Sequence, residues 1–208
     1  MKALTLQAFV LMWKRALMQV GERAGEFSRL DAVTGDGDHG TAIVQALDSV
    51  VEMAEKGTEF KAMLNDMGMN VMMRTSGSTS TLIGAFLLGM SDHAEGTELD
   101  SNQVKQMFKG GLEGVKKQTQ AGIGDKTMMD ALIPAIEAML ECGSDDVCQL
   151  LSIAANAAQH GANTTTGMKA RFGRARNYGD RSIGHADAGA LSWACMFDAF
   201  KQSACNSR

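Results

Sequence analysis

Three aspartates lie within an eight-residue stretch of the chain that also contains two glycines: Asp31, Asp36 and Asp38. Carboxylate oxygens are ligands that hard divalent cations such as Mg²⁺ take in proteins, usually together with the phosphates of a substrate. Glycines let the backbone bend tightly enough for alternate carboxylates to converge. The amides around Gly40 and Thr41 open the next predicted helix, whose dipole favours an anion. The stretch therefore predicts a loop, just before a helix, that holds metal and phosphate.

Three other kinds of structure could contain such a stretch: a dinucleotide-binding loop, an EF-hand and a solvated turn. Gly35, Gly37 and Gly40 fit the dinucleotide fingerprint G-x-G-x-x-G, but no Val/Ile-rich strand precedes them. Asp36 and Asp38 would also repel a bare pyrophosphate, by about 4 kcal/mol for each close pair at an intermediate dielectric. An EF-hand needs a glutamate at the twelfth position of its loop, and no count from the three aspartates reaches one. A solvated turn of aspartate and glycine is the remaining alternative.

Apolar residues recur at helical spacing along most of the chain, whereas alternating β-branched runs are scarce. The pattern predicts an all-α class and a single domain over residues 1–208. Pro134 is expected in the first turn of its helix, where its missing N–H costs little. Eight helices are predicted, at about 6–27, 43–54, 63–72, 82–90, 104–115, 133–140, 145–171 and 190–200.

A run of small hydroxylated residues, 76–81, interrupts the helical pattern between the third and fourth predicted helices. Such a loop can offer amides and hydroxyls to phosphate. It can equally serve as an N-cap and a helix–helix turn. The residues alone leave both interpretations open.

The composition excludes several classes of protein. A formal charge of −4 and a pI near 5.6 give no electrostatic reason to expect binding to nucleic acid or to an acidic membrane surface. No apolar run approaches the roughly 20 residues of a membrane span, and the amino terminus does not resemble a signal peptide. We therefore expect a cytoplasmic protein.

The chain contains four cysteines that form no C-x-x-C pair: Cys142, Cys148, Cys195 and Cys205. We therefore expect free thiols rather than disulfides or zinc ligands.

The acidic stretch and two later segments, 124–134 and 173–189, resemble the nucleotide-binding L subunit of the dihydroxyacetone kinases, a DAK2-type domain. The three blocks are spaced and ordered as in that family, and the resemblance covers nearly the whole chain. It implies an antiparallel up-and-down helical barrel or bundle with the nucleotide site at one end. Helical periodicity alone would not select this arrangement over another bundle.

The resemblance also implies roles for individual residues. The aspartates Asp31, Asp36 and Asp38 match the ligands of two Mg²⁺ ions, and Met128 matches a methionine that packs on adenine. Arg174 matches an arginine on the phosphate tail, within a glycine- and arginine-rich lid, and is the expected catalytic residue. Ser80 and Thr81 stand where the family usually has glycine and proline, and Ala188 where it often has proline. The other implied nucleotide contacts are His39, Gly40, Thr41, Ala42, Ser78, Thr79, Thr119, Asp187, Ala188 and Gly189.

By this resemblance the chain binds ADP or ATP and transfers a phosphoryl group to a ketose that a separate K-type subunit holds covalently. No Walker lysine is present, because Lys126 lacks the G-x-x-x-x-G-K frame. Within the family that the chain resembles, the ATP-using enzymes often carry cysteine at the position of His39. The resemblance therefore favours recharging of bound ADP by a phosphoprotein of the sugar phosphotransferase system over direct use of ATP. Three alternatives stay open. The substrate could be another short ketose such as erythrulose, the chain could be a non-catalytic Mg-nucleotide-binding regulator, and it could form a homodimer.

Overall fold

The computed structural model describes residues 2–206, and within that range the chain forms eight α-helices, two strands and two 3₁₀ segments. The prediction of an all-α chain with eight helices is confirmed. The strands are β1 (Ala3–Thr5) and β2 (Glu98–Asp100), and the 3₁₀ segments are η1 (Thr165–Gly167) and η2 (Arg174–Ser182). The helices are α1 (Leu6–Thr34), α2 (His39–Ala54), α3 (Phe60–Arg74), α4 (Ser78–Ser91), α5 (Ser101–Lys116), α6 (Met129–Glu141), α7 (Val147–Thr164) and α8 (Ala188–Asn206).

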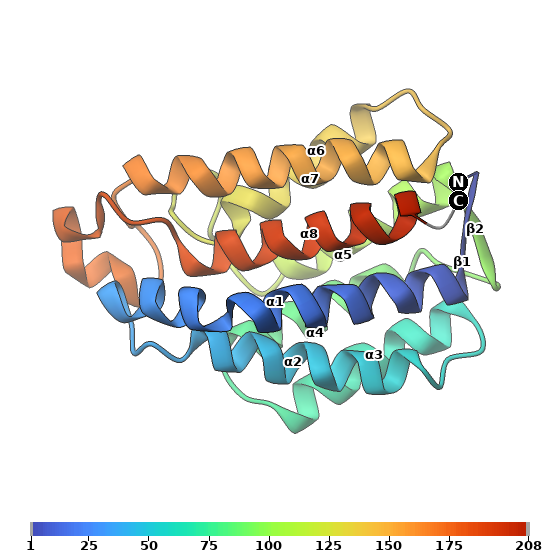
Figure 1. Ribbon diagram of the computed structural model, residues 1–208, viewed down its shortest axis with the longest axis horizontal. Coiled ribbons are helices and arrows are strands. Elements are labelled where there is room, and N and C mark those ends of the chain that lie inside the picture. Colours follow the sequence, from blue (N-terminus) through green and yellow to red (C-terminus); the bar gives the residue numbers. More distant parts are fainter. Residues whose placement is uncertain (1, 207–208) are drawn as a thin grey trace.

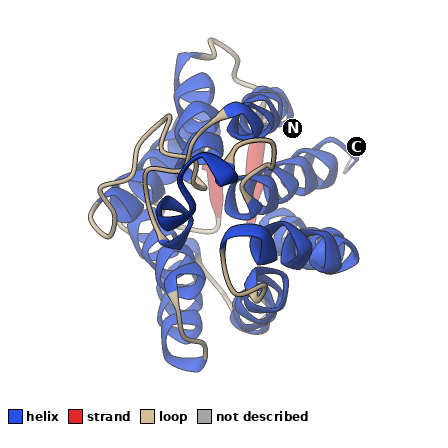
Figure 2. Ribbon diagram, turned by 90° about the vertical axis from the view of Figure 1, so that its left-hand side faces the viewer, coloured by secondary structure: helices blue, strands red, loops and turns tan. Residues whose placement is uncertain are grey.

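The helices form a closed ring in which each helix packs against the next and α8 packs against α1 (Figure 1). Consecutive helices run in opposite directions, so the connecting loops alternate between the two ends of the bundle. The loops after α1, α3, α5 and α7 meet at one end, which faces the viewer in Figure 2. The N-termini of α2, α4, α6 and α8 therefore lie at that same end. The antiparallel up-and-down arrangement that the resemblance implied is confirmed.

Helix α8 is the most deeply buried element of the ring. Besides its neighbours α1 and α7 it contacts α2 and α6, and its apolar residues are distributed around the whole helix. Aromatic rings surround it: Trp13 of α1 lies 4.9 Å from Phe200, and Phe86 of α4 lies 5.1 Å from Trp193, measured between ring centroids. Because α8 is packed on several sides, the loop that precedes it is anchored at its C-terminal end.

The first helix is longer than predicted. It continues beyond residue 27 to Thr34, because no glycine or proline follows Phe27 until Gly35, whose N–H bonds to the carbonyl of Asp31 and ends the helix. Asp31 therefore lies in the last turn of α1, and the prediction that all three aspartates lie on a loop is wrong for this residue. The helix supplies one rigid carboxylate, and the tight turn to α2 supplies the other two.

Two later boundaries also differ from the prediction. Pro134 is the sixth residue of α6 rather than a first-turn residue, so it leaves the Asp130 carbonyl without its helical N–H partner. Gly161 of α7 packs directly over that carbonyl, since a Cβ there would lie 1.8 Å from the oxygen. Helix α7 ends at Thr164, and not near 171: the chain tightens into the 3₁₀ segment η1 and becomes extended at Met168. The Thr165 hydroxyl accepts the N–H of Asp187.

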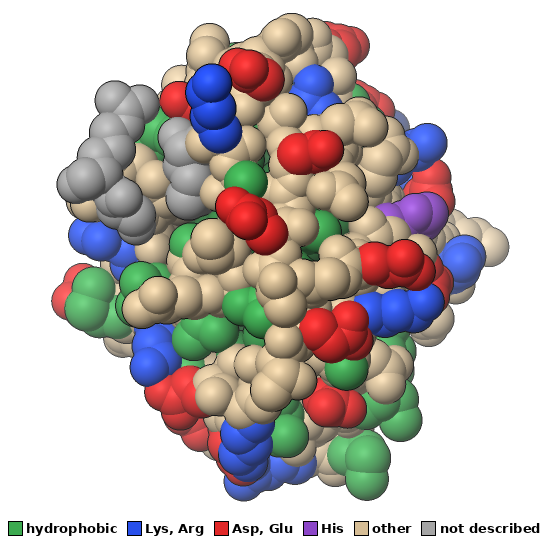
Figure 3. All heavy atoms as spheres, turned by 90° about the vertical axis from the view of Figure 1, so that its right-hand side faces the viewer, with side chains coloured by type: hydrophobic (Ala, Val, Ile, Leu, Met, Phe, Trp, Pro, Cys, Tyr) green, Lys and Arg blue, Asp and Glu red, His purple; other side chains and the backbone are tan. Residues whose placement is uncertain are grey.

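The opposite end of the bundle carries the short antiparallel ribbon, in which Leu4 pairs with Leu99. Three-residue strands are too short to show an alternating pattern, so the sequence did not reveal them. Acidic and basic side chains are scattered over this end, without one large patch of either charge (Figure 3). Among the described residues, none of the helices is both long and apolar enough to cross a membrane.

The expectation that no cysteine forms a disulfide is wrong. Cys148 in the first turn of α7 and Cys205 in the last turn of α8 are bonded to each other, with their Cα atoms 5.1 Å apart. The pair is separated by 57 residues in sequence, and it meets only because α7 and α8 are antiparallel neighbours. Cys142 and Cys195 are free thiols.

Candidate functional site

The loops at one end of the bundle surround a cavity of about 460 Å³, which is in the size range of small-molecule sites. Its walls come from the C-terminal end of α1, from the N-terminal turns of α2, α4, α6 and α8, and from the long loops before α6 and α8. The predicted site residues that line it are Asp31, Asp36, Asp38, His39, Ser78, Thr79, Thr119, Met128, Arg174, Asp187, Ala188 and Gly189.

The three aspartates form a compact acidic cluster at the α1–α2 turn. Each offers a carboxylate oxygen, and these oxygens lie within 4.8 Å of one another. Asp31 projects from the last turn of α1 and accepts the N–H of Gly37 at 2.8 Å, which folds the turn back on the helix. Desolvation and the negative charge of Asp36 raise the pKa of Asp38. Such a cluster of hard oxygen ligands suits a divalent cation.

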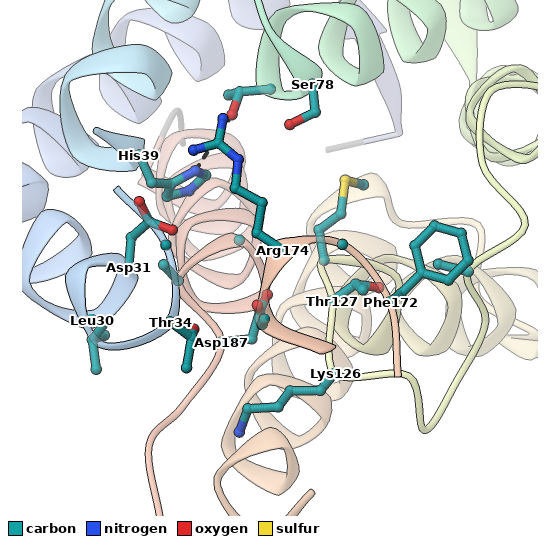
Figure 4. A pocket seen from close by; sticks show the side chains of 18 of the residues that line it. Leu30, Asp31, Thr34, His39, Ser78, Lys126, Thr127, Phe172, Arg174 and Asp187 are labelled. Carbon is teal, nitrogen blue, oxygen red and sulfur yellow. Dashed lines mark hydrogen bonds between the residues drawn. The ribbon is translucent and has the colours of Figure 1, made fainter. Parts of the chain in front are cut away.

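Arg174 approaches the acidic cluster from the lid, the long segment of residues 166–186 between α7 and α8. It follows Gly173 at the start of η2, and its guanidinium forms an ion pair with the Asp36 carboxylate across 138 residues of sequence. This contact lowers the pKa of Asp36. Both side chains are exposed to solvent, so the contact is easily exchanged for one with another anion. Figure 4 shows Arg174 extended toward Asp31 and His39.

His39, the first residue of α2, is fixed between two other helices. Its Nε2 lies 2.9 Å from the Ser192 hydroxyl of α8, and its Nδ1 lies 3.4 Å from the Thr79 hydroxyl of α4. Burial lowers the pKa of His39, which favours a neutral ring. The histidine therefore holds the N-termini of α2, α4 and α8 in register around the cavity.

Gly40, Thr41 and Ala42 are the predicted site residues that do not line the cavity. The Ala42 N–H makes the first intrahelical bond, to the carbonyl of Asp38. Gly40 has a packing role, because a Cβ there would lie 1.9 Å from the Ala24 carbonyl oxygen. Its small size lets α2 approach α1 closely, just below the acidic cluster. The Gly40 and Thr41 N–H groups lie in the first turn, where an α-helix leaves N–H groups without an intrahelical acceptor, so they could donate to a phosphate, whereas the Ala42 N–H is already used.

The hydroxylated run 76–81 forms the start of α4 rather than a free loop. Ser78 and Thr79 lie in its first turn and line the cavity. Ser80 is buried and its hydroxyl accepts a bond from Thr75 at 2.6 Å, while the Thr81 hydroxyl donates to the Gly77 carbonyl. Ser80 and Thr81 thus use their hydroxyls to secure the turn. The run is therefore a helix start that faces the cavity, with Gly77 rather than a hydroxylated residue at the N-cap position. Phosphate binding by this run stays a prediction.

The wall opposite the acidic cluster is largely apolar. Met128 lies at the N-terminus of α6, nearly buried, and Phe172 lies on the lid (Figure 4). Leu82 and Trp193 add apolar surface from α4 and α8. Gly189 packs on Met128, where an added Cβ would be in van der Waals contact with the methionine Cβ. The cavity thus combines an anionic, metal-suited side with an apolar side that suits a planar ring.

Sequence reasoning missed a polar network beneath the cavity. Asp130 is buried and accepts the N–H groups of Gly124 at 2.6 Å and Thr127 at 2.8 Å, which fixes the loop before α6. Lys126 is also buried, at 3% exposure, and lines the cavity. The nearby G-D-K-T-M-M-D run was the available signal, but a lysine outside a Walker frame gave no reason to expect burial.

Asp187 links this network to α8. Its carboxylate caps the helix by accepting the Ala190 N–H at 2.7 Å. Burial raises the pKa of Asp187 to about 7, although the Ala190 N–H and the Lys126 ammonium oppose the shift. Burial likewise lowers the pKa of Lys126. Burial at the base of the cavity therefore disfavours the charged forms of both Asp187 and Lys126.

The residues present fit a metal-bound nucleotide. The acidic cluster supplies oxygen ligands, four helix N-termini and Arg174 offer favourable charge to phosphates, and Met128 and Phe172 offer an apolar surface to a base. Bound by these aspartates, Mg²⁺ would neutralise the charge of phosphates that come close to Asp36 and Asp38. The site roles assigned from the resemblance stay predictions.

Comparison with solved structures supports this fold. The crystal structure of the dihydroxyacetone kinase from C. freundii in complex with AMP-PNP and Mg²⁺ matches with a TM-score of 0.72 at 23% sequence identity. The match covers 93% of this chain but 33% of that one. At this identity the likeness establishes the helical architecture alone.

Sequence comparisons identify the family. A family model described as the DAK2 domain matches residues 33–202. The ADP-binding subunit DhaL of the PEP-dependent dihydroxyacetone kinase 1 of Listeria innocua is 31% identical over 196 residues, which are 91% of this chain and 94% of that protein. The corresponding DhaL of Escherichia coli is 34% identical, over 78% of this chain and 80% of that protein. A D-erythrulose kinase of Mycolicibacterium smegmatis is 32% identical over 81% of this chain, but only 30% of that protein is covered. The chain therefore belongs to the DAK2 domain family and is similar, over most of its length, to DhaL subunits of dihydroxyacetone kinases.

Proposed function

We propose that this chain is the nucleotide-binding phosphotransfer subunit of a dihydroxyacetone-type kinase. The observation that carries the proposal is the composition of the cavity wall. Three clustered carboxylates and Arg174 lie together on one side of the cavity, and Met128 lies on the opposite, apolar side. The relatives described as ADP-binding subunits support the choice of nucleotide. ADP or ATP is the ligand, and Mg²⁺ is the metal.

The chain's own residues would contribute position and charge rather than a covalent step. Asp31, Asp36 and Asp38 would hold the metal, and Met128 would face the adenine. Arg174 would leave Asp36 for the phosphate tail, since its present partner is a solvent-exposed carboxylate. Phosphoryl transfer needs little more than in-line positioning and charge neutralisation, which these groups can supply.

A second subunit would present the ketose. Both ring nitrogens of His39 already face hydroxyl partners, Ser192 and Thr79, so this histidine is poorly placed to bind a sugar covalently. The relatives from Listeria innocua and Escherichia coli are themselves named as subunits. We therefore assign ketose binding to a K-type partner.

For the phosphoryl donor we favour a phosphoprotein of the phosphotransferase system that recharges tightly held ADP. DhaL relatives named as PEP-dependent or PTS-dependent support this choice. Slow release of ADP would follow from metal ligation, the Arg174 contact and the Met128 surface acting together. The purified chain should then carry ADP through gel filtration and should not be recharged by ATP alone.

The test is reconstitution. The purified chain is mixed with a K-type subunit and either ATP or a phosphoenolpyruvate-driven phosphoprotein donor, and formation of dihydroxyacetone phosphate is followed by coupled oxidation of NADH. Activity should require the K-type subunit and the phosphoprotein donor. Asp36→Asn should abolish it, whereas Asp48→Asn, an exposed aspartate of α2 outside the cavity, should not. Turnover by the chain alone would refute the division of labour, and rapid exchange of labelled ATP followed by transfer would refute the donor assignment.

A different ketose is the second candidate, because erythrulose kinases are among the relatives. Running the same assay with erythrulose in place of dihydroxyacetone separates the two substrates. A non-catalytic Mg-nucleotide-binding regulator would bind ADP in every arm and never transfer phosphate.

A further inference from the structure

The lid, residues 166–186, leaves the bundle and returns to it at nearly the same point. The Gly184 N–H donates to the Thr166 carbonyl at 2.8 Å, and the Asp187 N–H donates to the Thr165 hydroxyl at 2.9 Å. These two bonds form a neck at the base of the lid. Arg174 is carried on the far side of this neck, within η2. The position of Arg174 relative to the acidic cluster therefore depends on whether the neck stays closed.

A lysine from the loop before α6 forms hydrogen bonds to both segments of the neck. The Lys126 ammonium donates to the Thr165 carbonyl at 2.6 Å, where the chain enters the lid, and to the His185 carbonyl at 2.5 Å, where it leaves. Lys126 is 3% exposed. Hydrogen bonds from a charged donor are stronger than neutral ones, and in a buried site water cannot replace them.

The backbone of Lys126 also points to a role for its side chain. Its φ is +60°, a conformation that L side chains rarely adopt, and it is the one residue other than glycine with a positive φ among residues 2–206. Glycine would adopt this conformation without strain. The loop itself is already held by Asp130, which accepts the N–H groups of Gly124 and Thr127. The lysine side chain is therefore not needed for the turn and acts on the neck.

We infer that Lys126 is a positioning residue that closes the neck of the lid and so holds Arg174 over the acidic cluster. The inference deepens the proposed function and rests on it for the consequence that an open neck lets ADP leave faster. Its structural half, the closure of the lid, can be tested without any nucleotide.

The first experiment measures hydrogen exchange of the nucleotide-free protein by mass spectrometry. Lys126→Gly relieves the backbone and removes the ammonium, and Lys126→Met keeps the bulk of the side chain. Both should exchange lid residues 166–186 about tenfold faster or more than wild type, as expected when bonds from a charged donor are lost. Exchange in α1 and α8 should be unchanged. Lys169→Met is the matched control, because it removes another lysine whose ion pair, with Asp180 at 2.8 Å, lies on the exposed surface of the lid.

The second experiment measures release of a fluorescent ADP analogue and binding of Mn²⁺ without nucleotide. The two Lys126 variants should release the analogue about tenfold faster, whereas their Mn²⁺ affinity should match that of wild type. A merely structural defect would weaken both. Lys126→Gly with wild-type exchange in the lid would overturn the inference, as would equal acceleration in Lys169→Met. Failure of the wild-type chain to bind ADP would instead reject the proposed function and leave the exchange result to decide the role of Lys126.

Discussion

Replacing Gly40 by alanine should damage the candidate site without touching a cavity-lining residue. The added Cβ would lie 1.9 Å from the Ala24 carbonyl oxygen and 2.7 Å from the carbonyl carbon. Contacts below 3.0 Å are essentially never seen for real Cβ atoms, so α2 must move away from α1 by roughly 1 Å, because packed helices have no free volume to absorb the atom. Asp31 lies on α1 and Asp38 at the start of α2. The same movement would spread the acidic cluster.

The magnitude follows from overpacking. An extra methyl group in a close-packed interface costs about 1–3 kcal/mol, from which the higher helix propensity of alanine takes back at most about 1 kcal/mol. Gly40→Ala should therefore unfold at lower urea concentration than wild type, and its nucleotide affinity in Mg²⁺, measured by calorimetry, should fall.

The control is Gly21→Ala, also on a helix of this pair. Apart from the nearby backbone of its own helix, no atom lies within 4 Å of a Cβ at Gly21. This variant should therefore be more stable than wild type by up to about 1 kcal/mol and should bind nucleotide normally. If Gly40→Ala were as stable as Gly21→Ala, or bound Mg-nucleotide like wild type, close approach of α1 and α2 would not be what shapes the acidic cluster.

Three further predictions concern the cavity. Asp36→Asn, Asp38→Asn or a chelator should abolish nucleotide binding while circular dichroism stays helical, since phosphates cannot approach these carboxylates without a cation; tight metal-free binding of ADP would contradict this. Because the pKa of Asp187 is raised to about 7, the folded state binds a proton that the unfolded state releases near pH 4. Stability attributable to this group should therefore fall as pH rises from about 4 to about 7, by at most about 4 kcal/mol, and Asp187→Asn should remove that slope in urea titrations of metal-free protein; parallel pH profiles would reject the shift. Met128→Ala should weaken ADP binding about tenfold, by loss of apolar contact, and leave Mn²⁺ binding unchanged; equal ADP affinity would remove Met128 from the adenine surface.

The sequence predicted the helices and the acidic cluster because both are written in local patterns. Periodic apolar residues mark each helix, and the glycines among the three aspartates indicate a tight turn that can bring the carboxylates together. Asp31 was misplaced because the helix end depends on where Gly35 can cap it. That point lies after the apolar periodicity fades.

What the sequence could not show is contact between distant segments. The Cys148–Cys205 bond and the short ribbon both depend on partners far away in the chain. Lys126 is the clearest case. Its burial and its two carbonyl partners come from the meeting of two loops, its own and the lid, and no pattern around it would distinguish it from a surface lysine.

The closed ring has a practical consequence for attaching other molecules to this chain. β1 begins and α8 ends at the end of the bundle opposite the cavity (Figure 1). The cavity lies at the start of α8, whose 19 residues span about 28 Å. A fluorescent or affinity tag joined at either terminus should therefore leave the cavity open. A ketose-binding domain tethered at the C-terminus would need at least about eight extended residues of linker to reach the cavity mouth.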